Sequence, residues 1–298
     1  MTDRVWIIGF GDIARRVARR LLDQGKAVTG LVRRTEAAKE LKAMGVQSVA
    51  ADLDEAVSLM TVAVNAADVY FFAPPSSVDE NDWHMRNFLA AITGQRPRKI
   101  LYISTTGVYG NSHGAWVNEQ TPTNPNTDRG KRRLDAEQHL QAYGARNNIP
   151  VVILRVGGIY GPGRLPLRQL ESGRPVLTDE DSGYTNRIHA DDLAMICTEA
   201  MERGEGIYNV SDGKPGTMAQ YFTDLAEALG YPIPERISLE EARDVLPAGM
   251  LSYLEESRRL DTTRLMDELK VELQYPDLAS GIESIRKKMS QNFSTENS

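Results

Sequence analysis

Short apolar runs alternate along the chain with longer segments in which apolar residues recur with a helical period. The first run, Val5 to Ile8, predicts a buried strand; a helix follows from about Asp12, and a second strand spans Ala27 to Val32. Further strands are predicted over 46–50, 69–72, 99–104 and 151–155, and further helices over 53–66, 82–93 and 129–147. This alternation is typical of an α/β fold with a doubly wound parallel sheet.

A glycine turn joins the first predicted strand to the first predicted helix. Gly9 permits the tight turn, Gly11 removes the side chain that would block a pyrophosphate, and Ala14 lets the helix pack closely on the strand. The N-terminus of the helix offers free N–H groups and a positive dipole end to phosphate. Because strand, turn, helix and strand follow in order, the segment predicts a dinucleotide-binding unit of the Rossmann type; the alternative is a glycine turn without a ligand.

The end of the second predicted strand indicates which dinucleotide binds. An NAD site usually presents a carboxylate there to the ribose 2′-hydroxyl, whereas an NADP site presents arginine to the 2′-phosphate. This strand ends in Val32, Arg33 and Arg34, with no acid until Glu36. NADP is therefore favoured over NAD, because the planar guanidinium binds phosphate oxygens in pairs. The alternative is that both arginines are ordinary surface charges.

In a doubly wound sheet, ligands bind at the carboxyl ends of the strands. The residues that follow the first four predicted strands are therefore candidates for cofactor binding. They are Gly9, Phe10, Gly11, Asp12, Ile13, Arg33, Arg34, Asp52, Leu53, Ala73, Pro74 and Pro75.

Composition narrows the class of protein. The 298 residues are enough for one large α/β core with a smaller lobe, and the net charge of −6 offers no electrostatic footprint for nucleic acid or a membrane. No apolar run approaches the roughly 20 residues that span a bilayer, and the chain starts in a strand instead of a signal peptide, so a cytoplasmic location is expected.

The single cysteine, Cys197, is expected to be a buried thiol, and no histidine pair has metal-ligand spacing.

Later motifs resemble those of a known family. STTGVYG (104–110), ILRVGGIYGPGR (153–164), RIHADDLA (187–194), GIYNVSDG (206–213) and the segment 260–282 look like successive signatures of the extended short-chain dehydrogenase/reductases, the epimerase/dehydratase superfamily. The resemblance implies a doubly wound parallel Rossmann sheet with a smaller, discontinuous C-terminal substrate lobe. The NADP-binding domain would comprise residues 1–161 and 184–212, and the lobe residues 162–183 and 213–298. It also implies a homodimer through the helices 82–93 and 129–147.

The resemblance places Thr105 where the family has its active-site serine or threonine. The segment TDRGKRRLDAEQHL departs from the family's YxxxK, because Arg129 stands in the tyrosine's place and Arg133 in the lysine's. A guanidinium stays protonated and cannot exchange a proton usefully, so the acid/base pair is lost. An alternative register pairs Lys131 with Thr127 and also lacks tyrosine.

Two further residues carry open alternatives. Asp82 either replaces the asparagine of the family's catalytic tetrad or caps the helix that it precedes. In RIHADDLA, His189 is expected to pack in the structure while an aspartate caps the following helix.

Together, these features predict an NADP-dependent oxidoreductase that acts on a small carbonyl or hydroxyl substrate. Thr105 would hydrogen-bond the substrate oxygen, Arg129 or Arg133 would stabilise developing negative charge, and the proton would come from water or Tyr109. One alternative is a sensor that binds NADP(H) without turnover. The other is a nucleotide-sugar epimerase or dehydratase, against which the missing tyrosine argues.

Overall fold

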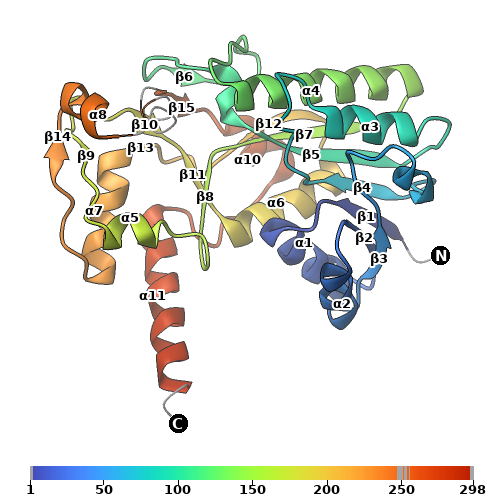
Figure 1. Ribbon diagram of the computed structural model, residues 1–298, viewed down its shortest axis with the longest axis horizontal. Helices are drawn as coiled ribbons and strands as arrows, with labels where there is room; N and C mark the ends of the chain where they lie inside the picture. The colour runs from blue at the N-terminus through green and yellow to red at the C-terminus, as the bar shows by residue number, and fades with distance from the viewer. Residues whose placement is uncertain (1–2, 247–250, 252–253, 255, 296–298) are drawn as a thin grey trace.

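A parallel sheet forms the centre of the molecule (Figure 1). The computed structural model describes residues 3–246, 251, 254 and 256–295. Within these residues, seven strands hydrogen-bond in the order β12-β7-β5-β4-β1-β2-β3, which is the order of a doubly wound Rossmann sheet. Their bounds are β1 (Arg4–Ile8), β2 (Ala27–Val32), β3 (Gln47–Ala50), β4 (Asp68–Phe71), β5 (Lys99–Thr105), β7 (Val151–Val156) and β12 (Gly206–Val210).

Helices cover both faces of this sheet (Figure 1). On one face lie α1 (Asp12–Asp23), α2 (Thr35–Ala43) and α6 (Ala190–Arg203), and α10 (Thr263–Leu269) packs beside α6 and β12. The opposite face carries α3 (Trp83–Ala91), α4 (Asp128–Asn147) and the 3-10 turn η1 (Ser58–Thr61). None of the helices in the described ranges is long and apolar enough to cross a membrane.

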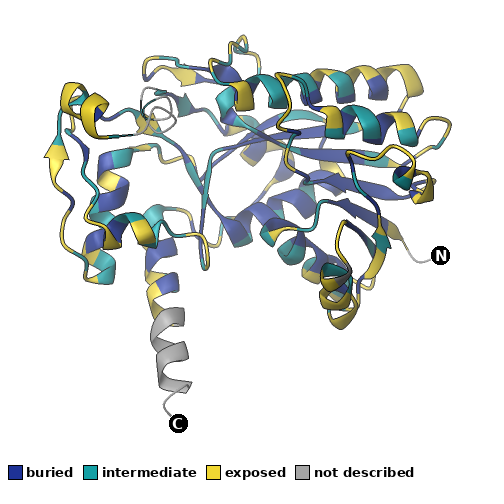
Figure 2. Cartoon of the chain, viewed as in Figure 1, coloured by how far each residue is buried: buried dark blue, intermediate teal, exposed yellow. Residues whose placement is uncertain are grey.

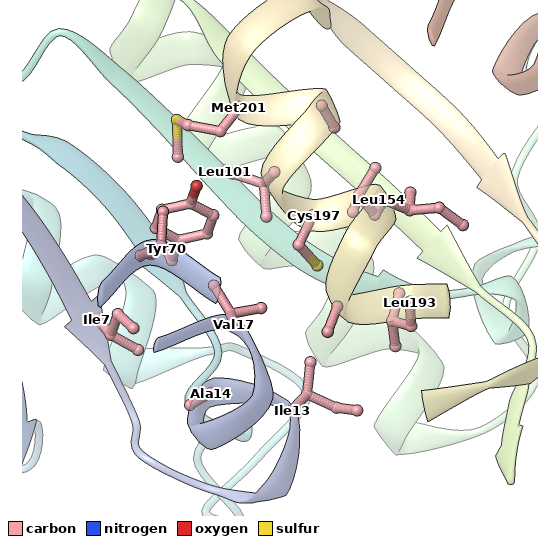
Figure 3. Packing of buried hydrophobic residues seen from close by; sticks show 14 of the residues in the cluster. Ile7, Ile13, Ala14, Val17, Tyr70, Leu101, Leu154, Leu193, Cys197 and Met201 are labelled. Carbon is pink, nitrogen blue, oxygen red and sulfur yellow. The ribbon is translucent and has the colours of Figure 1, made fainter. Parts of the chain in front are cut away.

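The apolar runs of the sequence form the core between these layers, and the outward faces of the helices are exposed (Figure 2). Figure 3 shows Val17 of α1 and Cys197 of α6 between the two helices and the sheet. Cys197 is completely buried, as predicted, and burial raises the pKa of its thiol. The core therefore holds α1, and with it the glycine turn, against the centre of the sheet.

A second, smaller apolar cluster lies away from the sheet. It joins Leu170, Val176, Phe222 and Ile282. The elements around it are α5 (Leu167–Glu171), β9 (Val176–Leu177), α7 (Met218–Leu229), β14 (Arg236–Ile237), α8 (Leu239–Val245) and α11 (Leu278–Thr295). Short paired strands complete the described chain: β6 (Trp116–Val117) with β15 (Arg259–Leu260), β8 (Gly158–Tyr160) with β11 (Arg187–His189), and β10 (Tyr184–Thr185) with β13 (Gly216–Thr217).

The helix predicted over 53–66 is wrong, because only the short turn η1 forms there. The Ser58 hydroxyl donates to the carbonyl of Asp52 and accepts from its N–H, and such local side-chain bonds compete with helical bonds. Farther along, Val62 and Val64 are buried on either side of an exposed Ala63, which is the alternation of an extended segment. The Gln95 side chain bonds the carbonyl of Val62 and the N–H of Val64, which completes the extended backbone.

Two helix starts show how the capping residues named in the sequence analysis are used. Asp82 is the N-cap of α3, and its Oδ1 accepts from the N–H groups of His84 and Met85. At the start of α6 the expected aspartate cap is wrong: His189 itself is the N-cap and its Nδ1 accepts from the N–H of Asp191. Asp192 turns instead to the N–H groups of Gln274 and Tyr275. A buried imidazole can take the capping role because its unprotonated nitrogen is an acceptor.

Candidate functional site

The first part of the site is a pocket of about 260 Å³ at the carboxyl ends of β1 to β4. It is lined by most of the residues that the sequence predicted for the cofactor: Gly9, Phe10, Gly11, Arg33, Arg34, Asp52, Leu53, Ala73 and Pro74. The structure thus brings the ends of four strands together at one edge of the sheet, as the parallel topology requires.

The two glycines of the turn have different roles. Gly9 has a φ of +87°, and a Cβ on it would lie 2.5 Å from the backbone of Ala73, so the turn and the end of β4 touch directly. Gly11 is the N-cap of α1, and a Cβ on it would meet no atom within 4 Å. Because Gly11 has no side chain to cap α1, the first N–H groups of the helix remain available at the pocket. These features fit a pyrophosphate.

Arg33 and Arg34 line the same pocket from the end of β2, and both side chains are exposed. Asp52 lies nearby after β3, and its Oδ1 accepts from the N–H of Asp54. The pocket therefore presents two cations at the position that discriminates between a ribose hydroxyl and a ribose phosphate.

Three predicted cofactor residues do not line the pocket. The carboxylate of Asp12 points to arginines instead, 3.1 Å from Nε of Arg16 and 3.2 Å from Nη1 of Arg164. Ile13 is buried in the core, and Pro75 is half-buried beyond the rim. Asp12 and Ile13 belong to α1, whose side chains project outward from the helix axis, whereas its first N–H groups point along the axis toward the pocket.

His84 also lines this pocket, although it was not among the residues that the sequence predicted for it. Its Nδ1 lies 2.8 Å from the carbonyl oxygen of Pro74, and its Nε2 lies 3.0 Å from Oδ1 of Asp54. His84 therefore ties the loop after β4 to the loop after β3. In the sequence, His84 was only a residue of the predicted helix 82–93, and its position there does not reveal which loops its side chain joins.

The second part of the site is a cavity of about 100 Å³ at the carboxyl ends of β5 and β7. Thr105 lines it at the end of β5, and its Oγ1 accepts from the N–H of Gly107 at 3.2 Å. Gly157 and Gly158 line the side formed after β7, and Tyr184 and Arg258 belong to segments much later in the chain. This cavity lies at the same edge of the sheet as the first pocket.

The two arginines in place of YxxxK differ in position. Arg129 is exposed in the first turn of α4. Arg133 is half-buried, and its Nη1 donates to the carbonyl oxygen of Ile103 at 2.8 Å and to the Tyr102 hydroxyl at 3.0 Å. Neither lines the cavity that contains Thr105. The structure therefore brings neither arginine to the cavity where one of them was predicted to stabilise developing negative charge.

The alternative register on α4 is also occupied by structural contacts. Thr127 is the N-cap of α4, and its hydroxyl accepts from the N–H of Gly130. Lys131 forms an ion pair with Glu80. Both side chains are thus explained by helix capping and surface pairing.

Tyr109 does not reach the cavity of Thr105. Its hydroxyl is buried and donates to Oδ1 of Asn209 at 2.7 Å, and burial raises the pKa of this phenol. The guanidinium of Arg155 lies 4.8 Å from the ring centroid. The prediction that Tyr109 supplies a proton to a substrate beside Thr105 is wrong, because the Tyr109 hydroxyl proton is bonded to Asn209 inside the core.

Beneath the cavity lies a buried ion pair between α4 and β7. Nη2 of Arg155 donates to Oε2 of Glu137 at 2.7 Å, and both side chains are almost completely buried. Ser104, next to Thr105, donates to Oε1 of Glu137. Burial would lower the pKa of Arg155, but the hydrogen bonds and charge of Glu137 outweigh it and raise that pKa. The pair holds the end of β5 against α4.

The fold and the glycine-turn pocket define a protein of the extended short-chain dehydrogenase/reductase class, as the sequence motifs predicted. Residues 5–211 match the NAD dependent epimerase/dehydratase family, and the chain belongs to that family.

Relatives with similar length support this membership. Protein YeeZ of Escherichia coli strain K12 is 27% identical over 292 residues, which cover 92% of this chain and 97% of YeeZ. A functionally unknown conserved protein from Silicibacter pomeroyi has a similar structure, with a TM-score of 0.79, 29% identity, and coverage of 97% of this chain and 99% of that one. UDP-glucose 4-epimerase from Thermus thermophilus, in complex with NAD, has a TM-score of 0.74 and 24% identity, with coverage of 95% and 99%; it shows the shared fold.

Proposed function

We propose that this protein is an NADP-dependent oxidoreductase that transfers hydride between the cofactor and a small carbonyl or hydroxyl substrate. The dinucleotide would lie in the pocket of the glycine turn, with its pyrophosphate on the N-terminus of α1. The substrate would lie in the smaller cavity beside Thr105, at the same edge of the sheet. The proposal rests on one observation: Arg33 and Arg34, at the end of β2, line this pocket.

The chain's own residues have defined tasks in this proposal. The bound nicotinamide would supply the hydride chemistry, and the protein supplies position and polarity. The Thr105 hydroxyl accepts from Gly107 and keeps its own proton for a substrate oxygen. The buried pair of Glu137 and Arg155 keeps the strand end that carries Thr105 in place.

NADPH is expected to bind at least tenfold more tightly than NADH, a difference of about 1.4 kcal/mol. Replacing both Arg33 and Arg34 with alanine should remove the preference, because the 2′-phosphate would lose its guanidinium partners. Calorimetric titration of the parent and the double variant measures both affinities. Arg168→Ala, which removes an exposed arginine in α5, is the control and should keep the preference.

Equal affinities of the parent protein for NADPH and NADH would contradict this proposal. The Thermus thermophilus epimerase, which is in complex with NAD, is a suitable protein for comparison in the same titration.

A sensor that binds NADP(H) without turnover is the second candidate. It is supported by Arg129 and Arg133, which occupy the places of tyrosine and lysine on α4 and lie outside the cavity of Thr105. The same loss disfavours a nucleotide-sugar epimerase or dehydratase that exchanges its proton through the family's tyrosine on α4. Tight NADPH binding without turnover of any carbonyl compound would favour the sensor.

A further inference from the structure

Tyr184 shares the small cavity with Thr105, although it belongs to β10 and to none of the family-like motifs. The residue is 39% exposed, so solvent reaches its side chain. Within the described residues, its hydroxyl makes no hydrogen bond, while its backbone N–H is held by the Ser257 hydroxyl at 2.9 Å. Tyr184 therefore lines this part of the site with a fixed backbone and a hydroxyl that has no hydrogen-bond partner among the described residues.

Two other polar side chains of the cavity are already committed. The Thr185 hydroxyl donates to the carbonyl of Gly216 at 3.2 Å. The Asn186 amide donates to the carbonyl of Arg258 and accepts from the N–H of Leu260. Both side chains connect the short strands around the cavity, and neither has a proton to give to a substrate.

Arg258 and Glu256 form an ion pair on the cavity wall. Arg258 also donates from Nε to the carbonyl oxygen of Gly110 at 2.9 Å. A guanidinium does not release its proton, and a carboxylate paired with it accepts hydrogen bonds instead of donating them.

The remaining groups with a proton are the hydroxyls of Thr105, Thr106 and Tyr184. Threonine hydroxyls are aliphatic alcohols and do not ionise usefully, whereas phenols ionise near pH 10 and serve as general acids. Tyr184 is thus the group of the cavity that is chemically suited to proton transfer.

Arg259 lies over the face of the Tyr184 ring. Its guanidinium carbon is 4.8 Å from the ring centroid, and its Nε donates to the carbonyl oxygen of Gly114 at 2.6 Å. The same guanidinium lies 5.3 Å from the ring of Trp116, so aromatic rings and a backbone carbonyl hold it in place. A fixed cation at this distance stabilises negative charge on a phenol oxygen by Coulomb attraction.

We propose that Tyr184 is the proton donor of the reaction and that Arg259 is a positioning residue that stabilises the resulting phenolate. This inference rests on the proposed hydride transfer. A bound reduced nicotinamide would supply hydride to the carbonyl carbon, and Tyr184 would give its hydroxyl proton to the carbonyl oxygen, so that the products would be an alcohol, the oxidised cofactor and a phenolate. The phenolate then takes a proton from water, which its exposure allows. In the reverse direction it removes the alcohol proton.

A tyrosine of the Thr105 cavity is thus paired with a cation, as in YxxxK, but the two residues come from β10 and β15 in place of α4. Glu256 and Arg258, which precede Arg259 in the chain, also line the cavity wall.

The test measures NADPH oxidation with a panel of small carbonyl probes: methylglyoxal, glyceraldehyde and dihydroxyacetone. Tyr184→Phe should lower kcat by about 100-fold or more, the usual contribution of a general acid. Its NADPH affinity should be unchanged, because Tyr184 does not line the glycine-turn pocket, and this also shows that the variant is folded. Tyr231→Phe, a half-buried tyrosine after α7, is the matched control and should keep the parent kcat.

Arg259 is tested by two substitutions. Arg259→Ala should lower kcat by roughly tenfold with KM little changed, and Arg259→Lys should restore most of kcat because it keeps the positive charge. Equal loss in both variants, or a change in KM alone, would overturn the positioning role.

The outcomes separate the two proposals. An active parent whose kcat is unchanged by Tyr184→Phe overturns the role of Tyr184 and leaves hydride transfer standing. A parent that binds NADPH but oxidises it with none of the probes overturns the proposed function, and the proton-donor role falls with it.

Discussion

Replacing Glu137 by leucine is expected to lower the free energy of unfolding by about 3–5 kcal/mol. The substitution leaves the guanidinium of Arg155 buried without its carboxylate, and it also removes the acceptor of the Ser104 hydroxyl. Arg155→Met should cost a similar amount, since it leaves Glu137 as the uncompensated charge. Urea unfolding followed by circular dichroism measures these changes.

The double variant Glu137→Leu with Arg155→Met should be closer to the parent than either single variant, because no charge remains buried. As a control, Glu283→Ala breaks an exposed ion pair with Lys287 and should leave stability nearly unchanged. Single variants as stable as the parent would contradict the view that this pair anchors the end of β5.

Gly9→Ala is expected to destabilise the protein strongly and to abolish NADPH binding. A Cβ on Gly9 would lie 2.5 Å from the Cα and N of Ala73, where only backbone movement relieves the clash, and the φ of +87° is unfavourable for alanine. The loss should be on the order of 2 kcal/mol or more, because strain and clash add. Thermal unfolding and calorimetric titration measure the two effects.

Gly11→Ala is the matched comparison in the same turn. Its Cβ would meet no protein atom within 4 Å, so the free energy of unfolding should stay close to that of the parent. NADPH affinity should nevertheless fall tenfold or more, because the methyl group would occupy space at the N-terminus of α1 that a pyrophosphate needs. Unchanged affinity of Gly11→Ala would place the pyrophosphate elsewhere.

Much of the cofactor pocket was predictable because local sequence controls it. Gly9, Gly11 and Arg33 lie at strand ends, and parallel strands bring their carboxyl ends to one edge whatever the details of packing. The exceptions follow from side-chain direction: Asp12 and Ile13 are in the same turn, yet they point to Arg16 and into the core. Position along the chain does not determine that direction.

The catalytic predictions placed residues by their position in a motif, but that position did not determine which side chains line the cavity. Thr105 lines a cavity, whereas Arg133 donates to the carbonyl of Ile103 and Tyr109 donates to Asn209 inside the core. Tyr184 was missed because no local pattern marks it. Its place beside Thr105 arises from the pairing of β10 with β13 and from contacts with the segment around Ser257.

The sequence by itself determined the α/β class, the family and the glycine turn, because periodicity, turn chemistry and ordered motifs act over short distances. Only the tertiary structure decided which side chains share the cavity of Thr105, and that the segment 53–66 forms the turn η1 and a short extended stretch instead of a helix. These outcomes depend on hydrogen bonds between residues far apart in the chain, such as Gln95 with Val62 and Val64. Such bonds override local propensity, because a buried backbone group must find a partner wherever the fold supplies one.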